Sequence, residues 1–288
     1  MANPTIKHFV FSRFFPFQRK NYPFDILDVD FLSKQLPLVN NMFRSLENQT
    51  NKNFELIFIS HPVFFEDKKY EFIFSRLRDS TSLPLRFMAN PKKSWNFDPQ
   101  FSKELFSLLN SAADNYDFVI TTRMDFDDFI FKGAVDEAQG KINECDNLLV
   151  YGYNKGYDYI YGELYPWHIT WGRQGNVGIF QSLILKSSFA KTMPCFCIEN
   201  FAHNRIKPQL KAFLEENNVE FSENMVQLNT STRNFIYFRH DFSQEHLVHN
   251  PVNSQIGNDN RKPLTSADIT KKQLEEEFGF FHVLNSIK

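Results

Sequence analysis

Three carboxylates stand within four residues of the sequence, at Asp125, Asp127 and Asp128. Carboxylates this close repel one another unless a cation lies between them, and their oxygens suit Mg²⁺ or Mn²⁺. Because side chains alternate in an extended segment, Asp125 and Asp127 project to the same side. A metal held there would act as a Lewis acid on a bound phosphate. The alternative is a solvated acidic turn that caps a helix beginning near Lys132.

The acidic cluster directly follows a predicted strand in a chain that alternates strands and helices. Apolar runs predict strands over 6–11, 54–60, 83–88, 117–122 and 147–153, and apolar spacing predicts helices over 31–48, 66–80, 99–112 and 132–143. Pro37 conflicts with the first helix, which we expect to start near it or kink there. This alternation predicts a mostly parallel sheet, in which ligands bind beyond the carboxyl ends of the strands.

The second half of the sequence is less regular. We interpret residues 151–171 as an aromatic, glycine-rich loop region. Strands are predicted over 177–185 and 235–239, and helices over 208–217 and 266–278. No internal repeat or low-complexity linker interrupts the chain, so we expect a single domain with a C-terminal extension.

Residues 121–128 resemble the T-R-x-D-x-D-D signature of a bacterial family described as rhamnosyltransferases. That family has the single Rossmann-like A-type fold of many glycosyltransferases. Residues 11–14, 35–55 and 237–240 resemble other parts of the family pattern. The resemblance implies a metal-dependent enzyme that uses Mn²⁺ or Mg²⁺. It would move a sugar from a nucleotide-diphosphate donor to a glycan or lipid-linked acceptor, in surface polysaccharide synthesis.

The resemblance also implies that the two halves of one α/β domain have different functions. Residues 1–153 would form the nucleotide-sugar-binding half of the mostly parallel sheet. Residues 154–288 would form the acceptor-side half, including the C-terminal helices. A lipid-linked acceptor would be compatible with peripheral membrane association, although the sequence contains no convincing basic amphipathic helix.

The resemblance assigns roles at the first strand ends and the acidic cluster. Asp125 would contact the ribose or the metal, and Asp127 would ligate the metal. Arg13 and Ser60 would lie near the nucleotide. Arg123 would pair with the acidic cluster or with phosphate, since a guanidinium suits bidentate phosphate contacts, and a purely structural salt bridge is an equal alternative.

Two further functions need a third metal ligand and a general base. His240 or His203 would serve as a third metal ligand, against the alternative of ordinary polar histidines. If the reaction inverts the anomeric centre, a carboxylate must deprotonate the acceptor hydroxyl. Asp128, Glu199 and Glu163 are candidates, and the resemblance favours Glu199. The alternative for Glu199 is an ordinary surface residue.

Aromatic side chains are dense around residues 157–171. Tyr161, Trp167 and Trp171 could stack on sugar rings while their polar groups bond hydroxyls, and Arg173 could reach a diphosphate. The alternative is a small aromatic core under a long loop.

Other classes of protein are disfavoured by what the sequence lacks. A net charge of −2 argues against nonspecific nucleic-acid binding. No G-x-G-x-x-G, P-loop or G-x-S-x-G motif is present. The absence of a signal-like start, of a long apolar run and of paired cysteines predicts a cytoplasmic protein. The remaining rivals are a two-metal phosphodiesterase or nuclease and a non-catalytic carbohydrate-binding protein of the same fold.

Overall fold

The computed structural model describes most of the chain in ten segments. These are residues 3–15, 23–90, 99–160, 163–168, 180–194, 196–201, 205–229, 234–239, 263–265 and 268–280, without the side chains of 167, 168 and 239. Within them, no helix is both long enough and apolar enough to cross a membrane.

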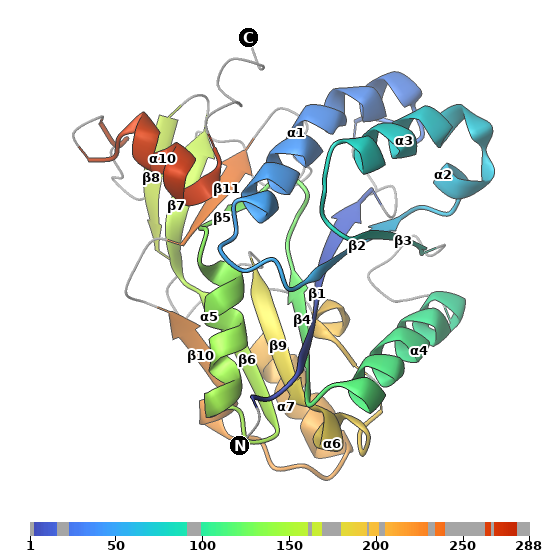
Figure 1. Ribbon diagram of the computed structural model, residues 1–288, viewed down its shortest axis with the longest axis vertical. Helices are drawn as coiled ribbons and strands as arrows, with labels where there is room; N and C mark the ends of the chain where they lie inside the picture. The colour runs from blue at the N-terminus through green and yellow to red at the C-terminus, as the bar shows by residue number, and fades with distance from the viewer. Residues whose placement is uncertain are drawn as a thin grey trace.

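A seven-stranded sheet forms the centre of the molecule (Figure 1). In spatial order its strands are β10 (Val226–Asn229), β6 (Leu148–Tyr153), β9 (Gln181–Lys186), β4 (Phe118–Arg123), β1 (Ile6–Phe14), β2 (Glu55–Ser60) and β3 (Leu85–Ala89). β9 runs antiparallel to both of its neighbours, and all other pairs are parallel. The predicted α/β class with a mostly parallel central sheet is confirmed.

Helices cover both faces of this sheet (Figure 1). The longer ones are α1 (Val29–Glu47), α3 (Glu71–Asp79), α4 (Pro99–Asn115), α5 (Ala134–Gly140) and α7 (Ile206–Glu216). The shorter ones are α2 (Val63–Glu66), η1 (Lys68–Tyr70), η2 (Lys141–Glu144), α6 (Ser187–Ala190), η3 (Ile198–Asn200) and η4 (Glu223–Met225).

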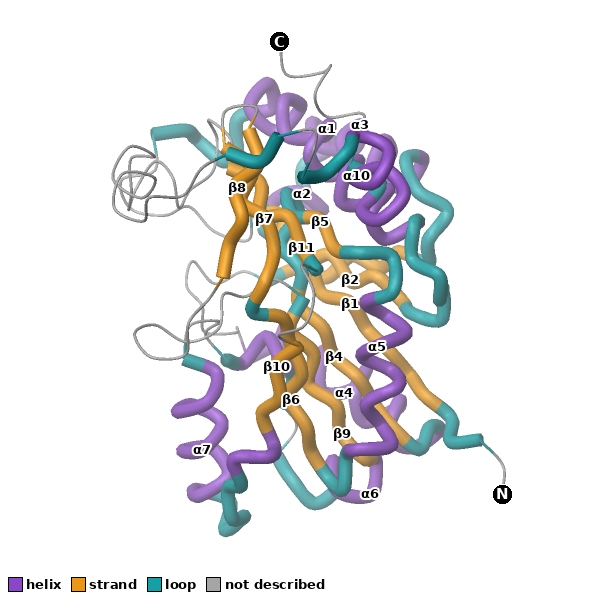
Figure 2. The backbone as a smooth tube through the Cα atoms, turned by 90° about the vertical axis from the view of Figure 1, so that its left-hand side faces the viewer, coloured by secondary structure: helices purple, strands orange, loops and turns teal. Residues whose placement is uncertain are grey.

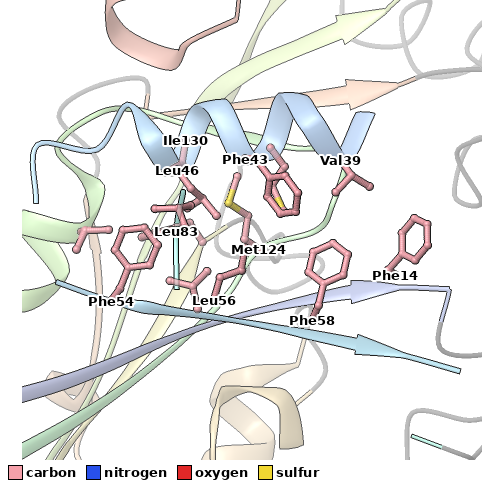
Figure 3. Packing of buried hydrophobic residues seen from close by; sticks show 14 of the residues in the cluster. Phe14, Val39, Phe43, Leu46, Phe54, Leu56, Phe58, Leu83, Met124 and Ile130 are labelled. Atoms are coloured by element: carbon pink, nitrogen blue, oxygen red, sulfur yellow. The ribbon is translucent and has the colours of Figure 1, made fainter. Parts of the chain in front are cut away.

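Alternate residues of each central strand enter two separate apolar clusters. On β1, Val10 and Phe14 join the cluster under α1, α3 and α5, whereas Phe9 and Phe11 join the cluster under α4 and α7. Figure 3 shows the first cluster, with Phe43 of α1 lying above the strand residues. Burial on both faces explains why these strands are continuous apolar runs in the sequence.

A four-stranded sheet lies beyond one end of the central sheet (Figures 1 and 2). Its order is β5 (Phe129–Ile130), β11 (Phe235–Arg239), β7 (Lys155–Ile160) and β8 (Glu163–His168). Helix α10 (Lys271–Phe278) packs on it through Leu274 and Phe278. β5 comes from the first half of the chain and β9 and β10 come from the second, so the halves share both sheets. The division of function between the halves stays a prediction.

Three helix predictions need correction at their boundaries. α1 begins at Val29, well before Pro37, because Asp28 caps it by accepting a 2.7 Å hydrogen bond from the Phe31 amide. The helix expected over 66–80 is divided into three, since the Asp67 side chain accepts from Lys69 N and starts a new turn. The last helix starts at Lys271, after a capping box formed by Thr270 and Gln273.

The prediction that residues 151–171 form a loop is wrong, because β7 and β8 occupy much of this range as an antiparallel pair. Gly156 is not a turn residue there. A Cβ atom at Gly156 would lie 2.3 Å from the Phe235 ring, so glycine permits β7 and β11 to approach.

Candidate active site

The acidic turn, residues 125–128, joins the two sheets. β4 ends at Arg123, and the Met124 amide still donates to Phe11 O of β1 at 2.9 Å. β5 then begins at Phe129, and it pairs with β11 of the second sheet. The turn therefore lies at the carboxyl end of β4, where ligands bind in sheets of this kind.

The acidic turn does not cap the helix that follows it. α5 begins after Gly133, which offers no side-chain hydrogen bond to the helix amides. The capping alternative is therefore wrong, and the three carboxylates need another explanation.

Asp125 and Asp127 are half-buried, and their negative charges repel each other. Burial, then repulsion from Asp127, raises the pKa of Asp125 to about 6, although Arg123 and Arg13 act in the other direction. Burial is the largest cause of this shift, and the repulsion from Asp127 adds to it. A cation bound between the two carboxylates would oppose that repulsion.

Asp128 lies behind this pair, with no exposed surface. Its Oδ1 accepts a 3.3 Å hydrogen bond from the Phe238 amide of β11, so Asp128 ties the turn to the second sheet. Burial, reinforced by Asp127 and Asp125, raises its pKa well above the usual value. Asp158 of β7, also fully buried, adds repulsion.

The structure brings two predicted site residues, Arg13 and Glu199, into direct contact across 186 residues of sequence. Arg13 Nε and Nη2 both reach Oε2 of Glu199, and Nη2 also donates to the Glu199 carbonyl oxygen at 3.3 Å. The exposed fractions of these side chains are 11% for Arg13 and 0% for Glu199. Oε1 of Glu199 is buried and has no hydrogen-bond partner among the described residues.

Arg123 is buried between β9 and the segment 196–201. Nη1 donates to Phe201 O at 2.8 Å, and Nη2 donates to Oε1 of Gln181 at 3.1 Å. Burial lowers the pKa of Arg123, while Glu199 and Asp125 oppose that change. With 1% of its surface exposed, Arg123 cannot contact a phosphate unless the side chain moves.

Two residues at the site were given no role from the sequence. Thr121 Oγ1 accepts from the Ile198 amide at 3.0 Å, and Gln181 receives Arg123 as described above. Both are polar residues buried on strands of the central sheet. Thr121 lies in the segment 121–128 that carries the resemblance, whereas only its polarity within a predicted strand distinguished Gln181.

Ser60 ends β2 next to β1, in register with Phe14. Its carbonyl oxygen accepts from the Asn90 amide at 3.0 Å, and its buried hydroxyl has no hydrogen-bond partner in the part of the chain that the structure describes. Ser60 thus lies at the same edge of the sheet as Arg13.

Several predicted residues lie outside the described residues. They are His203, His240, Tyr161, Trp171 and Arg173, and for Trp167 only the backbone, in β8, is described. Among the side chains that are described, no three His, Cys, Asp or Glu residues form a metal-binding group. The roles of these residues stay predictions.

The opposite face of β4 holds an uncharged hydrogen-bonded chain. Gln139 Nε2 donates to Asn53 O at 2.8 Å and lies 3.3 Å from His8 Nδ1, which must therefore accept. His8 Nε2 consequently donates to Thr122 Oγ1 at 2.7 Å, and that hydroxyl lies 2.6 Å from Ser182 Oγ. Burial lowers the pKa of His8 to about 3, so the ring is neutral at pH 7.

No family model and no curated protein matches the sequence. Solved structures with a similar chain path include TarS of S. aureus, at 14% identity and a TM-score of 0.38 over 82% of this chain and 37% of TarS. A protein of Desulfovibrio desulfuricans G20, assigned as a nucleotide-diphospho-sugar transferase, matches at 10% identity and a TM-score of 0.39 over 94% of both chains.

A cytidylyltransferase from Leptospira borgpetersenii matches at 10% identity and a TM-score of 0.37, over 80% of this chain and 78% of that chain. This chain spans little more than a third of TarS. These similarities are remote.

Proposed function

We propose that the protein is a metal-dependent glycosyltransferase that moves a sugar from a nucleotide-diphosphate donor to a glycan or lipid-linked acceptor. Rhamnose, which the sequence resemblance implies, is the first donor sugar to test. Surface polysaccharide is the corresponding acceptor class.

The observation that supports this proposal is the position and state of Asp125 and Asp127. Both are half-buried at the carboxyl end of β4, and neither caps the helix that follows. The pKa of Asp125 is raised chiefly by burial and further by repulsion from Asp127. Paired carboxylates in this condition suit a cation whose remaining ligands come from a substrate diphosphate.

The donor set fits a hard divalent cation. Mg²⁺ commonly uses one or two carboxylates and completes its shell with water and substrate phosphates, so Asp125 and Asp127 suffice. A cation held by them would neutralise charge on the departing nucleoside diphosphate. His203 or His240 would add a nitrogen ligand better suited to Mn²⁺.

Glu199 is the carboxylate that we propose as the base. It is electrostatically coupled to Asp125, and its Oε1 accepts no hydrogen bond in the described structure. A carboxylate oxygen that accepts no hydrogen bond from the protein can receive the proton of an acceptor hydroxyl. Asp128 suits this role less well, because its raised pKa favours the protonated form.

Thermal unfolding with UDP, GDP, CMP and dTDP, each with and without Mn²⁺, tests the proposal. A ligand at about 100 times its dissociation constant should stabilise the protein by roughly 2.7 kcal/mol. We expect one nucleotide to do so only with Mn²⁺, and we expect Asp127→Ala to abolish the effect. Asp146→Ala, which removes an exposed carboxylate outside the site, is the matched control.

A folded wild type that binds Mn²⁺ but responds to no nucleotide would refute the transferase. Hydrolysis of a phosphodiester by that protein would establish the two-metal rival instead. Nucleotide-sugar binding without transfer or hydrolysis would identify a non-catalytic binding protein.

A further inference from the structure

The ion pair between Arg13 and Glu199 is costly for the fold. Both side chains are largely withdrawn from water, and Glu199 is fully covered. Removing two charges from water often costs as much as their attraction returns, so a buried ion pair is weak evidence for stability. A role in positioning explains this pair better than a role in folding.

The backbone around Glu199 is held by several contacts besides the 3.3 Å hydrogen bond from Arg13 Nη2 to the Glu199 carbonyl oxygen. Thr121 accepts the Ile198 amide on one side of Glu199, and Arg123 donates to Phe201 O on the other. Asn200 closes the turn by accepting the Cys197 amide at 2.7 Å. The two Arg13 contacts to Oε2 are therefore free to fix the carboxylate itself rather than the chain that carries it.

Arg13 engages only one carboxylate oxygen of Glu199. Nε and Nη2 converge on Oε2, while Oε1 is buried without a hydrogen bond from any described residue. A buried acceptor with no donor destabilises the fold, so an arrangement of this kind is more readily explained by use than by stability. Oε1 is the oxygen left without a protein donor, and a substrate proton can reach it only if the covered side chain becomes exposed.

We propose that Arg13 is a positioning residue that orients Glu199, and that it is not a nucleotide ligand. The inference rests on the proposed function. In the reaction, the acceptor O–H proton passes to Glu199 Oε1 as the acceptor oxygen bonds to the anomeric carbon. The bond from that carbon to the diphosphate oxygen breaks, and the nucleoside diphosphate leaves with the electron pair.

Steady-state kinetics of Arg13→Gln, Glu199→Gln and the double variant test this assignment. We expect Arg13→Gln to lower kcat about 10- to 100-fold, as small misplacements of reacting groups do, with little change in KM for the donor. The double variant should be no slower than Glu199→Gln, because Arg13 acts through Glu199. Arg86→Gln, which breaks the 2.8 Å Arg86–Glu55 pair at β3, is the control and should retain wild-type kcat.

A raised donor KM with unchanged kcat in Arg13→Gln would overturn the assignment in favour of nucleotide binding. Losses that multiply in the double variant would also overturn it, since they would show independent roles. A merely structural Arg13 would lower the amount of folded enzyme and leave kcat per folded molecule unchanged.

A crystal structure of Arg13→Gln separates this inference from the proposed function. We expect the Glu199 carboxylate to move while the backbone of 197–201 keeps its place. An unmoved carboxylate would refute positioning, even if the enzyme transfers sugar. A moved carboxylate would support positioning even if no nucleotide-sugar is turned over, in which case the proposed reaction alone would fail.

Discussion

Thr122 and Arg123 are neighbours on β4, yet their side chains enter opposite environments. Thr122 belongs to a chain of uncharged groups that includes His8 and Ser182, in which each member has a hydrogen-bond partner. Arg123 belongs to a charged cluster with Arg13 and Glu199, in which Arg123 Nε and Glu199 Oε1 have no hydrogen-bond partner within the described structure.

Buried polar groups therefore serve different purposes on the two faces of β4. A fully bonded neutral network specifies and stabilises a core. A charged cluster with unused donors and acceptors costs stability, and such sites are kept where substrate supplies the missing partners. We therefore expect substitutions on the His8 face to change stability with little effect on turnover, and substitutions on the Glu199 face to reduce turnover even where stability is restored.

The largest effect should come from Glu199→Gln, which keeps the shape but removes the base. We expect transfer to fall about 10²- to 10⁴-fold, the usual contribution of a general base. Measured kcat, corrected for the folded fraction, checks this. Wild-type turnover in the Gln variant would show that Glu199 is not the base. The Glu199 face would then not differ from the His8 face in its effect on catalysis.

A second prediction concerns the stability of the charged face. Glu199→Leu alone should cost about 3 kcal/mol, because it leaves Arg13 without its carboxylate. Arg13→Met combined with Glu199→Leu should return within about 1 kcal/mol of wild type while remaining inactive. Urea unfolding of the three proteins measures both values. An additive loss in the double variant would mean that the ion pair stabilises the fold.

The neutral face should make stability depend on pH through His8. Its folded pKa of about 3 lies below the unfolded value, so the unfolded chain binds more protons between these values. The contribution of His8 is present above pH 6.5 and is lost as pH falls, by about 2 kcal/mol between pH 7 and pH 5. Asp125 and Asp128, with raised pKa values, act with the opposite sign.

The His8 contribution is therefore measured as a difference between wild type and His8→Gln at each pH. We expect the stability advantage of wild type to shrink as the solution is acidified. A pH-independent difference would show that His8 titrates alike in the folded and unfolded states.

The smallest predicted effect is that of Thr122→Val. The substitution removes the acceptor of His8 Nε2–H and should cost about 1 to 2 kcal/mol. Transfer by the folded variant should match wild type, because Thr122 faces away from Glu199. Chemical unfolding and kcat measured on one preparation check both expectations. A loss of kcat without a loss of stability would assign Thr122 to the active site.

The central sheet could be predicted because its strands are buried on both faces. β1, β2 and β4 each appear in the sequence as a short apolar run, and the acidic turn directly follows one of them. Position at a strand end and a cluster of like charges are local properties. They sufficed to indicate Asp125 and Asp127 before any contact was known.

The second sheet and the partners within the site could not be predicted in the same way. β5 has only two residues. β7 contains Gly156, where glycine is needed because the ring of Phe235, distant in sequence, packs against it. Arg13 and Glu199 are individually ordinary in sequence. Nothing local indicates that an arginine at one strand end will hold a carboxylate 186 residues away.

The bond from Phe238 to Asp128 spans 110 residues and has a consequence for biosynthesis. A ribosome adds about 5 to 20 residues per second, so roughly 5 to 20 seconds separate the synthesis of the acidic turn from that of the strand that fastens it. Until β11 emerges, the nascent chain carries the turn without its second sheet. The proposed cation site would therefore reach its native geometry late in translation, after all seven strands of the central sheet have been made.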